Sequence, residues 1–295
     1  VALGTDNITE LEKKIYNLGE IDLSSSVSGR AFVRARNCDP LSSFGDFIAI
    51  SGIVDTDCAK LIKREVSDGI ITLDYTPDAL EILKSKKGGK FYILKGKKLD
   101  YQNIEFREIF GMALSQASNR ELVTEKYLEN IVTENKELEE QQKKDLILAT
   151  ITLKYTPSNS IAYALNGMVI GVGAGQQNRV DCIKLAGRKS QVFLLRQHPL
   201  SLKLLDMFKP GIKRQDKVNA VIKYINNDFS ELELENWRSL FIDGAITLFD
   251  PDIIDSYLSD KNGLSISSDA FFPFRDNIDY ASKYGVSYLL QPGGS

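Results

Sequence analysis

The feature that most constrains the fold is an Asn-Gly dipeptide that stands between two apolar runs. Residues 161–165 precede Asn166 and Gly167, and residues 168–172 follow them. A two-residue turn between antiparallel strands requires positive φ at both central positions, which Asn and Gly adopt more readily than other residues. The sequence therefore predicts an antiparallel hairpin of two apolar strands in the second half of the chain.

Short apolar runs alternate with helical patterns in the first half of the chain. Residues 47–52, 70–73 and 91–94 have the length and composition of short strands. Residues 57–66 and 78–84, which lie between them, have helical patterns. Because strands that alternate with helices form layered structures, we predict an α/β fold.

A strongly charged segment separates the two halves. Residues 126–145 are rich in Glu, Gln and Lys, and residues 134–144 lack a sustained apolar stripe, which indicates an exposed connection. Beyond it, residues 146–153 predict a buried helix, and strand and helix patterns alternate again. We therefore divide the 295 residues into two domains, 1–145 and 146–295.

Charge and composition argue against several classes of protein. With 37 basic and 40 acidic side chains the net charge is −3, which does not provide the basic face that binds duplex nucleic acid. No apolar stretch reaches the roughly 20 residues that cross a bilayer. Cys38, Cys58 and Cys182 are widely spaced and form no CxxC pair, so we expect neither a disulfide framework nor a zinc cluster, and a cytoplasmic location. The lysines at 84–90 surround a Gly-Gly turn, and we expect a solvated connector there.

The chain contains a single histidine, His198. A Ser-His-Asp or Cys-His mechanism would have to use that one ring, and a metal site built from several histidines is impossible. His198 stands directly before Pro199 and a helical pattern. We expect it to be a structural residue near a helix start rather than a catalyst.

Four segments place small or polar residues where a core does not require them. Gly45 suits either a close ligand approach or a tight turn. The hydroxyl groups of residues 156–160 suit an ion, a substrate or the unpaired carbonyls of a helix end. The glycine-rich turn at 171–179 ends in Arg179 and suits either a phosphate or a purely structural turn. The aromatic residues of 269–277 suit core packing or a planar heteroaromatic ligand.

A dinucleotide-binding fold would also place a glycine-rich turn before a helix. The strand before residue 171 belongs to an antiparallel hairpin, however, and the glycine spacing differs from GxGxxG. The sequence therefore argues against a nicotinamide-dependent oxidoreductase, although this function stays an alternative. Saturable binding of the nicotinamide cofactor is the test for it.

Five segments, in order along the chain, resemble the aminoimidazole carboxamide ribonucleotide (AICAR) transformylase domain. That domain forms the C-terminal part of the bifunctional purine biosynthesis enzyme that also carries IMP cyclohydrolase. The segments are residues 42–47 (SSFGDF), 64–71 (REVSDGII), 154–160 (KYTPSNS), 166–179 (NGMVIGVGAGQQNR) and 266–277 (ISSDAFFPFRDN).

The resemblance implies formyl transfer from 10-formyltetrahydrofolate to AICAR, which gives formyl-AICAR and tetrahydrofolate. It also implies two cytidine-deaminase-like subdomains with mixed sheets and no catalytic zinc, and a homodimer whose active sites are shared between subunits. The sequence has no HxE with PCxxC, the residues with which a zinc deaminase makes its hydroxide.

The resemblance further implies roles for individual residues. Asn159 would donate a hydrogen bond where oxyanion charge develops, and it counts as both catalytic and substrate-binding. The other residues that would contact the nucleotide are Gly45, Asp68, Arg179, which would hold the phosphate, and Phe271. Those that would line the folate pocket are Val180, Asp276 and Ser295. Those that would hold a potassium ion are Thr156, Ser158, Ser160 and Asp269.

One departure from the family concerns the proposed base, a Lys-His pair that comes a few residues before a Val-Ala-Leu-Gly-like segment. The present sequence starts at Val1, within that segment, so the pair lies outside it. We expect the chain to be part of a longer enzyme. The alternative is a shortened, catalytically silent nucleotide-binding or dimerisation module.

Overall fold

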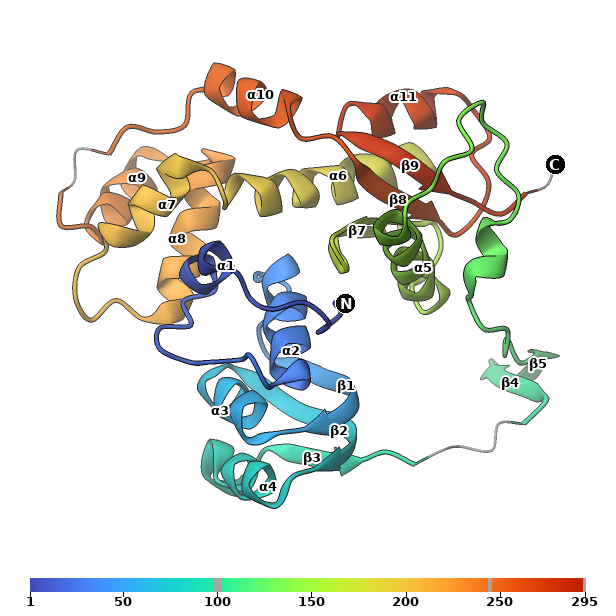
Figure 1. The fold of residues 1–295 in the computed structure, drawn as a ribbon, viewed down its shortest axis with the longest axis horizontal. Helices are drawn as coiled ribbons and strands as arrows, with labels where there is room; N and C mark the ends of the chain where they lie inside the picture. Colours follow the sequence, from blue (N-terminus) through green and yellow to red (C-terminus); the bar gives the residue numbers. More distant parts are fainter. Residues whose placement is uncertain (98–101, 244–245, 294–295) are drawn as a thin grey trace.

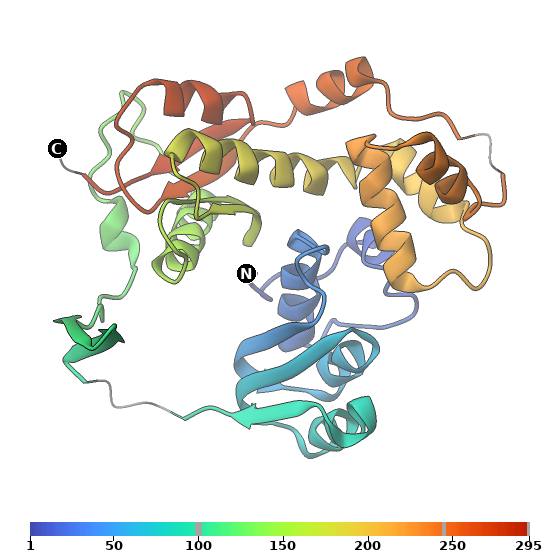
Figure 2. The same cartoon turned by 180° about the vertical axis from the view of Figure 1, so that it is seen from behind.

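Two larger sheets and one two-stranded sheet form in the described part of the chain (Figure 1). The structure is a computed structural model that describes residues 1–97, 102–243 and 246–293. The three-stranded sheet and the four-stranded sheet lie in different parts of the molecule, as the view from behind also shows (Figure 2). Helices pack against both sheets, so the predicted α/β class is confirmed.

The first sheet is parallel throughout, in the order β1-β2-β3. Its strands are β1 (Asp46–Val54), β2 (Ser67–Tyr75) and β3 (Tyr92–Lys95). The helices of this region are α1 (Glu10–Ile15), α2 (Val27–Cys38), α3 (Thr56–Arg64) and α4 (Pro77–Lys84), and the 3-10 turn η1 (Lys86–Gly89) follows them. The predicted strands and helices are confirmed. The expectation of a mixed sheet is wrong for this sheet, because helical crossovers return the chain in the same direction.

The lysine-rich turn at 84–90 is not simply a solvated connector. Lys86 is buried, and its Nζ donates to the Ile62 carbonyl at 3.0 Å and also to the Glu65 carbonyl. These carbonyls belong to the end of α3, where the last C=O groups have no partner within the helix. The expectation of a solvated connector therefore fails for Lys86, which adds a donor at this helix end, whereas Lys84, Lys87 and Lys90 are exposed.

Helix α2 leads from the first sheet toward the second (Figure 1). Its N-cap is Ser26, whose side chain accepts from the Gly29 N–H. Arg34 on this helix is buried and forms an ion pair with Glu12 at 2.7 Å. Cys38 at its other end belongs to the core of the second sheet. Helix α2 therefore ties the two parts of the chain together.

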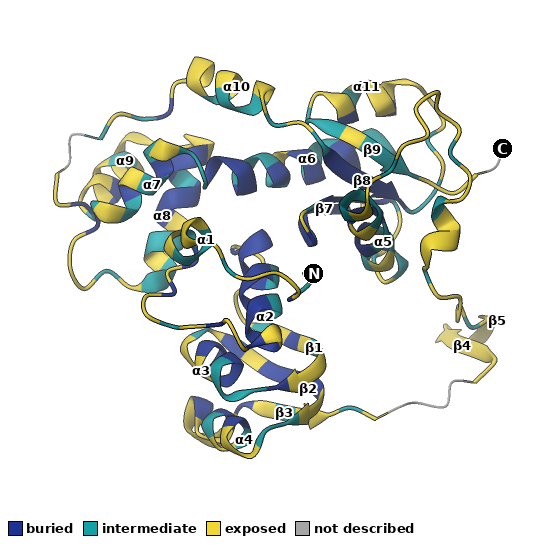
Figure 3. Ribbon diagram, in the orientation of Figure 1, coloured by how far each residue is buried: buried dark blue, intermediate teal, exposed yellow. Residues whose placement is uncertain are grey.

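An exposed hairpin follows the first sheet, and every residue of its strands is exposed (Figure 3). Its strands are β4 (Ile104–Ile109) and β5 (Met112–Ala117), and the next elements are the 3-10 turn η2 (Glu125–Leu128) and helix α5 (Glu140–Lys154). The connection predicted at 126–145 therefore ends earlier than expected. Its last residue, Asp145, is buried in α5 and accepts from the N–H groups of Asn166 at 2.9 Å and Gly167 at 2.6 Å.

The second sheet has the order β7-β6-β8-β9. Its strands are β6 (Ser160–Leu165), β7 (Met168–Ala174), β8 (Leu264–Ser268) and β9 (Val286–Leu290). Strand β6 is antiparallel to β7 and β8, whereas β8 and β9 are parallel. Asn166 and Gly167 have φ of 51° and 74°, so the predicted hairpin and its turn are confirmed.

Helices cover both faces of the second sheet. Ile161 and Tyr163 pack in one core with α6 (Arg179–Leu195) and α11 (Asp276–Ser282), whereas Ala162 and Ala164 pack in another core with α5. Alternate residues of a strand point to opposite faces, which explains the division.

Gly171 and Gly173 allow α6 to lie directly on β7. A Cβ atom at Gly171 would come within 2.2 Å of the Ala186 carbonyl oxygen, and one at Gly173 within 2.2 Å of the Cys182 carbonyl oxygen. In the next turn Gly175 has φ +68°, a conformation that favours glycine. Two glycines of the glycine-rich segment therefore serve packing, and the third forms the turn into α6.

A helical group follows α6, and its elements are α7 (Pro199–Asp206), α8 (Arg214–Asn226), α9 (Glu231–Arg238) and α10 (Pro251–Ser259). Its core is aromatic and includes Tyr224 and Trp237. His198 is the N-cap of α7, where its Nδ1 accepts from the Leu200 N–H at 3.1 Å and its ring packs on Phe249. Burial lowers the pKa of His198. The structural role predicted for His198 is confirmed.

In the described ranges, none of the helices is both long enough and apolar enough to span a membrane.

Candidate functional site

Residues from three elements converge at one end of the second sheet. Ser160, the first residue of β6, pairs with Ala174, the last residue of β7. Ile161 pairs with Ser268, the last residue of β8. Because Arg179 opens α6 shortly after β7, the segments before β6, after β8 and at the start of α6 meet there.

Arg179 holds this cluster together. Its Nη1 donates to Ser268 Oγ at 3.0 Å and forms an ion pair with Asp269, and its Nη2 donates to Asn159 Oδ1 at 3.0 Å. The side chain is only 10% exposed. Asn159 Nδ2 in turn donates to the Gln176 carbonyl at 3.1 Å, so both ends of the Asn159 amide are fixed.

Asp269 is the acidic member of the cluster. Its carboxylate accepts from the Ser160 N–H at 3.1 Å, from Ser158 Oγ and from Arg179. Burial raises the pKa of Asp269, but the hydrogen bonds from Ser158 and Arg179 outweigh burial, and the pKa lies below its ordinary value. Asp269 is therefore a carboxylate at neutral pH.

Three of the four residues predicted to hold potassium lie together, namely Ser158, Ser160 and Asp269. Ser160 Oγ is buried and has no hydrogen-bond partner among the described residues, so its lone pairs are free for a cation. Thr156 Oγ1 donates to the Thr152 carbonyl of α5 at 2.8 Å. Hydroxyl and carboxylate oxygens are the ligands that hard cations take, so the residues fit such an ion. No group of three or more His, Cys, Asp and Glu side chains is placed to hold a metal within the described ranges.

Two further predicted residues meet at one end of the first sheet. The Gly45 N–H donates to the Val66 carbonyl at 3.0 Å, which places Gly45 close to Asp68. Gly45 has φ +70°, and no atom lies within 4 Å of a Cβ built on it. The Asp68 carboxylate forms an ion pair with Lys87, a partner that the sequence analysis assigned to a connector.

The remaining predicted residues lie near the Arg179 cluster along the chain. Phe271 follows Asp269 by two residues and is partly exposed, and Asp276 begins α11 and accepts from Asn277 Nδ2 at 2.7 Å. Val180 is the second residue of α6. Ser295 lies outside the described residues.

Gly45 and Asp68 belong to a different sheet from the Arg179 cluster. Across the described part of the chain, no hydrogen bond or ion pair joins the two groups, and Figures 1 and 2 show their sheets in separate places. The structure therefore brings the predicted residues together as two sets rather than one.

Sequence reasoning missed two contacts of these sets. Ser268 accepts from Arg179, and Cys182 Sγ donates to the Asn159 carbonyl at 3.1 Å. Ser268 lies inside the segment 266–277, where its position directly before Asp269 was the available signal. For Cys182 the sequence carried none, because its proximity to Asn159 depends on how α6 packs on the sheet.

Comparison with known proteins agrees with the segments that form these sets. A sequence profile described as the AICARFT/IMPCHase bienzyme matches residues 23–189, more than half of the chain. The bifunctional purine biosynthesis protein PurH of Buchnera aphidicola is 28% identical over 270 residues, which cover 90% of this chain and 38% of that protein. The protein of the same name from Elusimicrobium minutum is 29% identical over 272 residues, which cover 92% of this chain and 40% of that protein. The chain thus spans about two fifths of the length of these curated relatives.

Proposed function

The chain belongs to the AICARFT/IMPCHase bienzyme family, and from that membership we propose that it takes part in purine biosynthesis by transferring a formyl group from 10-formyltetrahydrofolate to AICAR. The observation that carries the proposal is the partly buried contact between Arg179 and Asn159. It places a guanidinium, suited to a phosphate, beside an amide, suited to a developing oxyanion.

Arg179 retains donors for the phosphate of the nucleotide. A guanidinium has five N–H groups, and the contacts to Ser268, Asp269 and Asn159 use three of them. The two that remain suit a phosphate oxygen, and the N-terminus of α6 adds backbone donors and a partial positive charge. Asp269 balances the charge of Arg179, so the site needs further positive charge to hold a dianionic phosphate. A bound potassium ion would supply that charge beside Asp269.

Asn159 suits the oxyanion step of the reaction. The amine of AICAR attacks the formyl carbon, the carbonyl oxygen gains negative charge, and the intermediate then expels the folate nitrogen, which takes up a proton as tetrahydrofolate leaves. One N–H of Asn159 Nδ2 donates to Gln176, and the other remains for the oxyanion. The conjugated amine is a poor nucleophile, so a general base would contribute roughly 10²- to 10⁴-fold. The resemblance assigns that base to the Lys-His pair outside this sequence.

We further propose that the protein is a homodimer with shared active sites. The separation of Gly45 and Asp68 from the Arg179 cluster supports this arrangement, because a second copy can bring the two sets together. The hairpin of β4 and β5, whose strands are exposed (Figure 3), supports it as well, since Phe106 is 69% exposed and Phe110 is 98% exposed. Apolar side chains that gather on an exposed element commonly mark an interface.

The deciding experiment measures tetrahydrofolate release with AICAR and 10-formyltetrahydrofolate. It compares the chain of residues 1–295 with a chain extended at both ends. Turnover in the extended chain is the expected result. Absence of turnover in both chains would overturn the enzyme proposal, and saturable AICAR binding without turnover would favour the catalytically silent nucleotide-binding module.

A further inference from the structure

A pocket of about 500 Å³ lies among α1, α7, α8 and the ends of α2 and α6. This volume lies within the roughly 300–1,000 Å³ of small-molecule sites. We call it the α1–α8 pocket, and its lining includes Tyr16, Asn37, Arg196, Leu205, Arg214 and Lys217. None of the residues assigned to formyl transfer lines this pocket.

Arg196 brings a buried positive charge to the pocket. The residue is 4% exposed, and its Nη1 and Nη2 donate to the carbonyl and the Oδ1 of Asn37 at 2.6 and 3.1 Å. Among the described residues Arg196 has no carboxylate partner. The carbonyls at the end of α2 offer only about half an elementary charge. Asp39 acts on Arg196 only through space and is itself paired with Lys189 at 2.8 Å. Because a buried charge without a direct counterion is disfavoured, an anion in the pocket would stabilise Arg196.

Lys217 adds a second cation that lacks a carboxylate within the described ranges. Its Nζ lies 5.5 Å from the centre of the Phe208 ring, and this uncharged ring does not neutralise the ammonium group. The two other lysines of the pocket each have a carboxylate partner. Lys13 pairs with Glu10 at 2.7 Å, and Lys14 pairs with Asp206 at 2.6 Å. The acidic residues that line the pocket are therefore already engaged.

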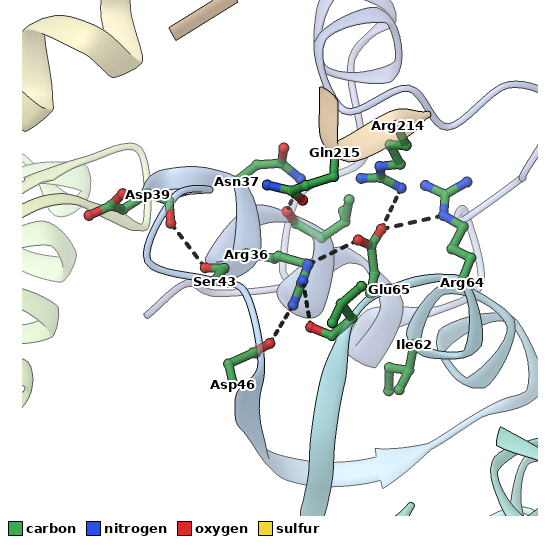
Figure 4. A network of polar contacts seen from close by, with 12 residues as sticks. Arg36, Asn37, Asp39, Ser43, Asp46, Ile62, Arg64, Glu65, Arg214 and Gln215 are labelled. Atoms are coloured by element: carbon green, nitrogen blue, oxygen red, sulfur yellow. Dashed lines mark hydrogen bonds and ion pairs between the residues drawn. The ribbon is translucent and has the colours of Figure 1, made fainter. Parts of the chain in front are cut away.

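Arg214 shares its counterion with two other arginines. Figure 4 shows Glu65 facing Arg36, Arg64 and Arg214. Its Oε2 accepts from Arg36 Nε at 3.1 Å, while its Oε1 lies 3.6 Å from Arg64 Nε and forms an ion pair with Arg214. Asp46 is 2.7 Å from Arg36 and relieves that guanidinium alone. Two carboxylates thus serve three guanidinium groups, and part of the Arg214 charge is left for the pocket.

The rest of the pocket wall is apolar, in contrast to the basic residues, and this limits the class of ligand that the pocket can bind. Leu205, Val218 and Val221 present apolar side chains, and Tyr16 adds an aromatic ring. We propose that the α1–α8 pocket binds a small organic anion, with a phosphate-like group at Arg196 and Lys217 and an apolar or aromatic body against these side chains. The net charge of the whole chain is −3, so a basic pocket is a local property and not a general one.

The test uses phenyl phosphate as the probe and isothermal titration calorimetry of the full chain at low salt. Saturable binding that Lys217→Gln weakens about tenfold is the expected result, since losing a charge-assisted contact changes affinity on that scale. Lys223→Gln is the matched control on the same helix, because Lys223 pairs with Glu233 and does not line the pocket. Phenol, which lacks the charged group, should bind at least tenfold more weakly than phenyl phosphate.

Further arms separate this proposal from the proposed function. Arg179→Ala should leave the phenyl phosphate affinity within about twofold of the unmodified chain. If Arg179→Ala abolishes binding and Lys217→Gln does not, the probe occupies the other site and the proposal is overturned. Lack of saturation up to about 10 mM, or equal losses in the Lys217 and Lys223 variants, would overturn it as well. Formyl transfer can succeed or fail independently of these outcomes.

Discussion

Arg179, the first residue of α6, donates a hydrogen bond from Nη2 to Oδ1 of Asn159, in the loop before β6, at 3.0 Å. The residue proposed to hold the phosphate therefore also orients the amide proposed to stabilise the oxyanion. The proposed function therefore implies that AICAR binding and turnover are coupled through this contact, and replacing either residue tests that coupling.

Asn159→Ala should lower kcat by roughly 10²- to 10³-fold, the effect of removing one oxyanion donor, and change AICAR affinity much less. Steady-state release of tetrahydrofolate by the extended chain measures both quantities. Gln176→Ala is the matched control, because Asn159 donates to the backbone carbonyl of Gln176, which the substitution retains. Unchanged kcat in Asn159→Ala would remove Asn159 from the catalytic residues.

Arg179→Ala should weaken AICAR binding by about 10- to 100-fold, since it removes charge-assisted hydrogen bonds to the phosphate. The corresponding nucleoside, which lacks the phosphate, should lose less than about threefold. Titration calorimetry with both ligands provides the comparison. Equal losses for the two would contradict the phosphate assignment.

The low pKa of Asp269 predicts an acid-sensitive contribution to stability. Burial opposes the effect, but the hydrogen bonds from Ser158 and Arg179 place the folded-state pKa below the ordinary value of 3.8. The contribution is therefore fully present above pH 3.8 and is lost as the pH falls through the folded-state pKa. Asp269→Asn should destabilise the protein by about 2 kcal/mol at pH 7 and by less at pH 3 in urea unfolding. A difference that does not depend on pH would contradict this.

Glu65→Gln should lower the free energy of unfolding by about 3 kcal/mol, because the side chains of Arg36, Arg64 and Arg214 would lose their shared counterion. Glu81→Gln is the control, since Glu81 forms an exposed pair with Lys84 and should change stability by less than about 1 kcal/mol. Urea unfolding monitored by circular dichroism measures both. Similar small effects would show that the arginine cluster needs no carboxylate.

If the active sites are shared between subunits, inactive variants should complement each other. At AICAR concentrations too low for either variant to bind, Asp68→Asn and Arg179→Ala should each show little activity alone. They should recover about a quarter of the normal activity when mixed as dissociated subunits and reassociated, because half of the dimers are mixed and each has one intact site. No recovery on mixing would place each complete site in one subunit.

Light scattering should show that Phe110→Ser weakens the dimer, whereas Phe274→Ser, which replaces an exposed Phe outside the hairpin, should not weaken it.

Local chemistry explains which elements could be predicted from the sequence. The turn at Asn166 and Gly167 depends on the φ preferences of two residues, and the capping box of α1 depends on Thr9 and Glu12. Helix α2 was missed because its buried face includes arginines, such as Arg34, whose partners come from distant residues. A sequence pattern presents such side chains as polar.

The candidate site divides in the same way. Asn159, Arg179 and Asp269 were identifiable from the segments that contain them, but their contact follows from the pairing of β6 with β7 and β8. The pairing of Asp68 with Lys87 depends similarly on how η1 lies beside β2. Long-range register was the information that the sequence could not supply.

Gly171 and Gly173 determine the distance between α6 and its sheet. A methyl group at either position would force the helix outward by about 1 Å, because interiors are too densely packed to absorb the overlap. Arg179, at the tip of that helix, would move with it, and its reach to Asn159 would be lost. The lack of side chains at Gly171 and Gly173 thus determines whether the long side chain of Arg179 reaches Asn159.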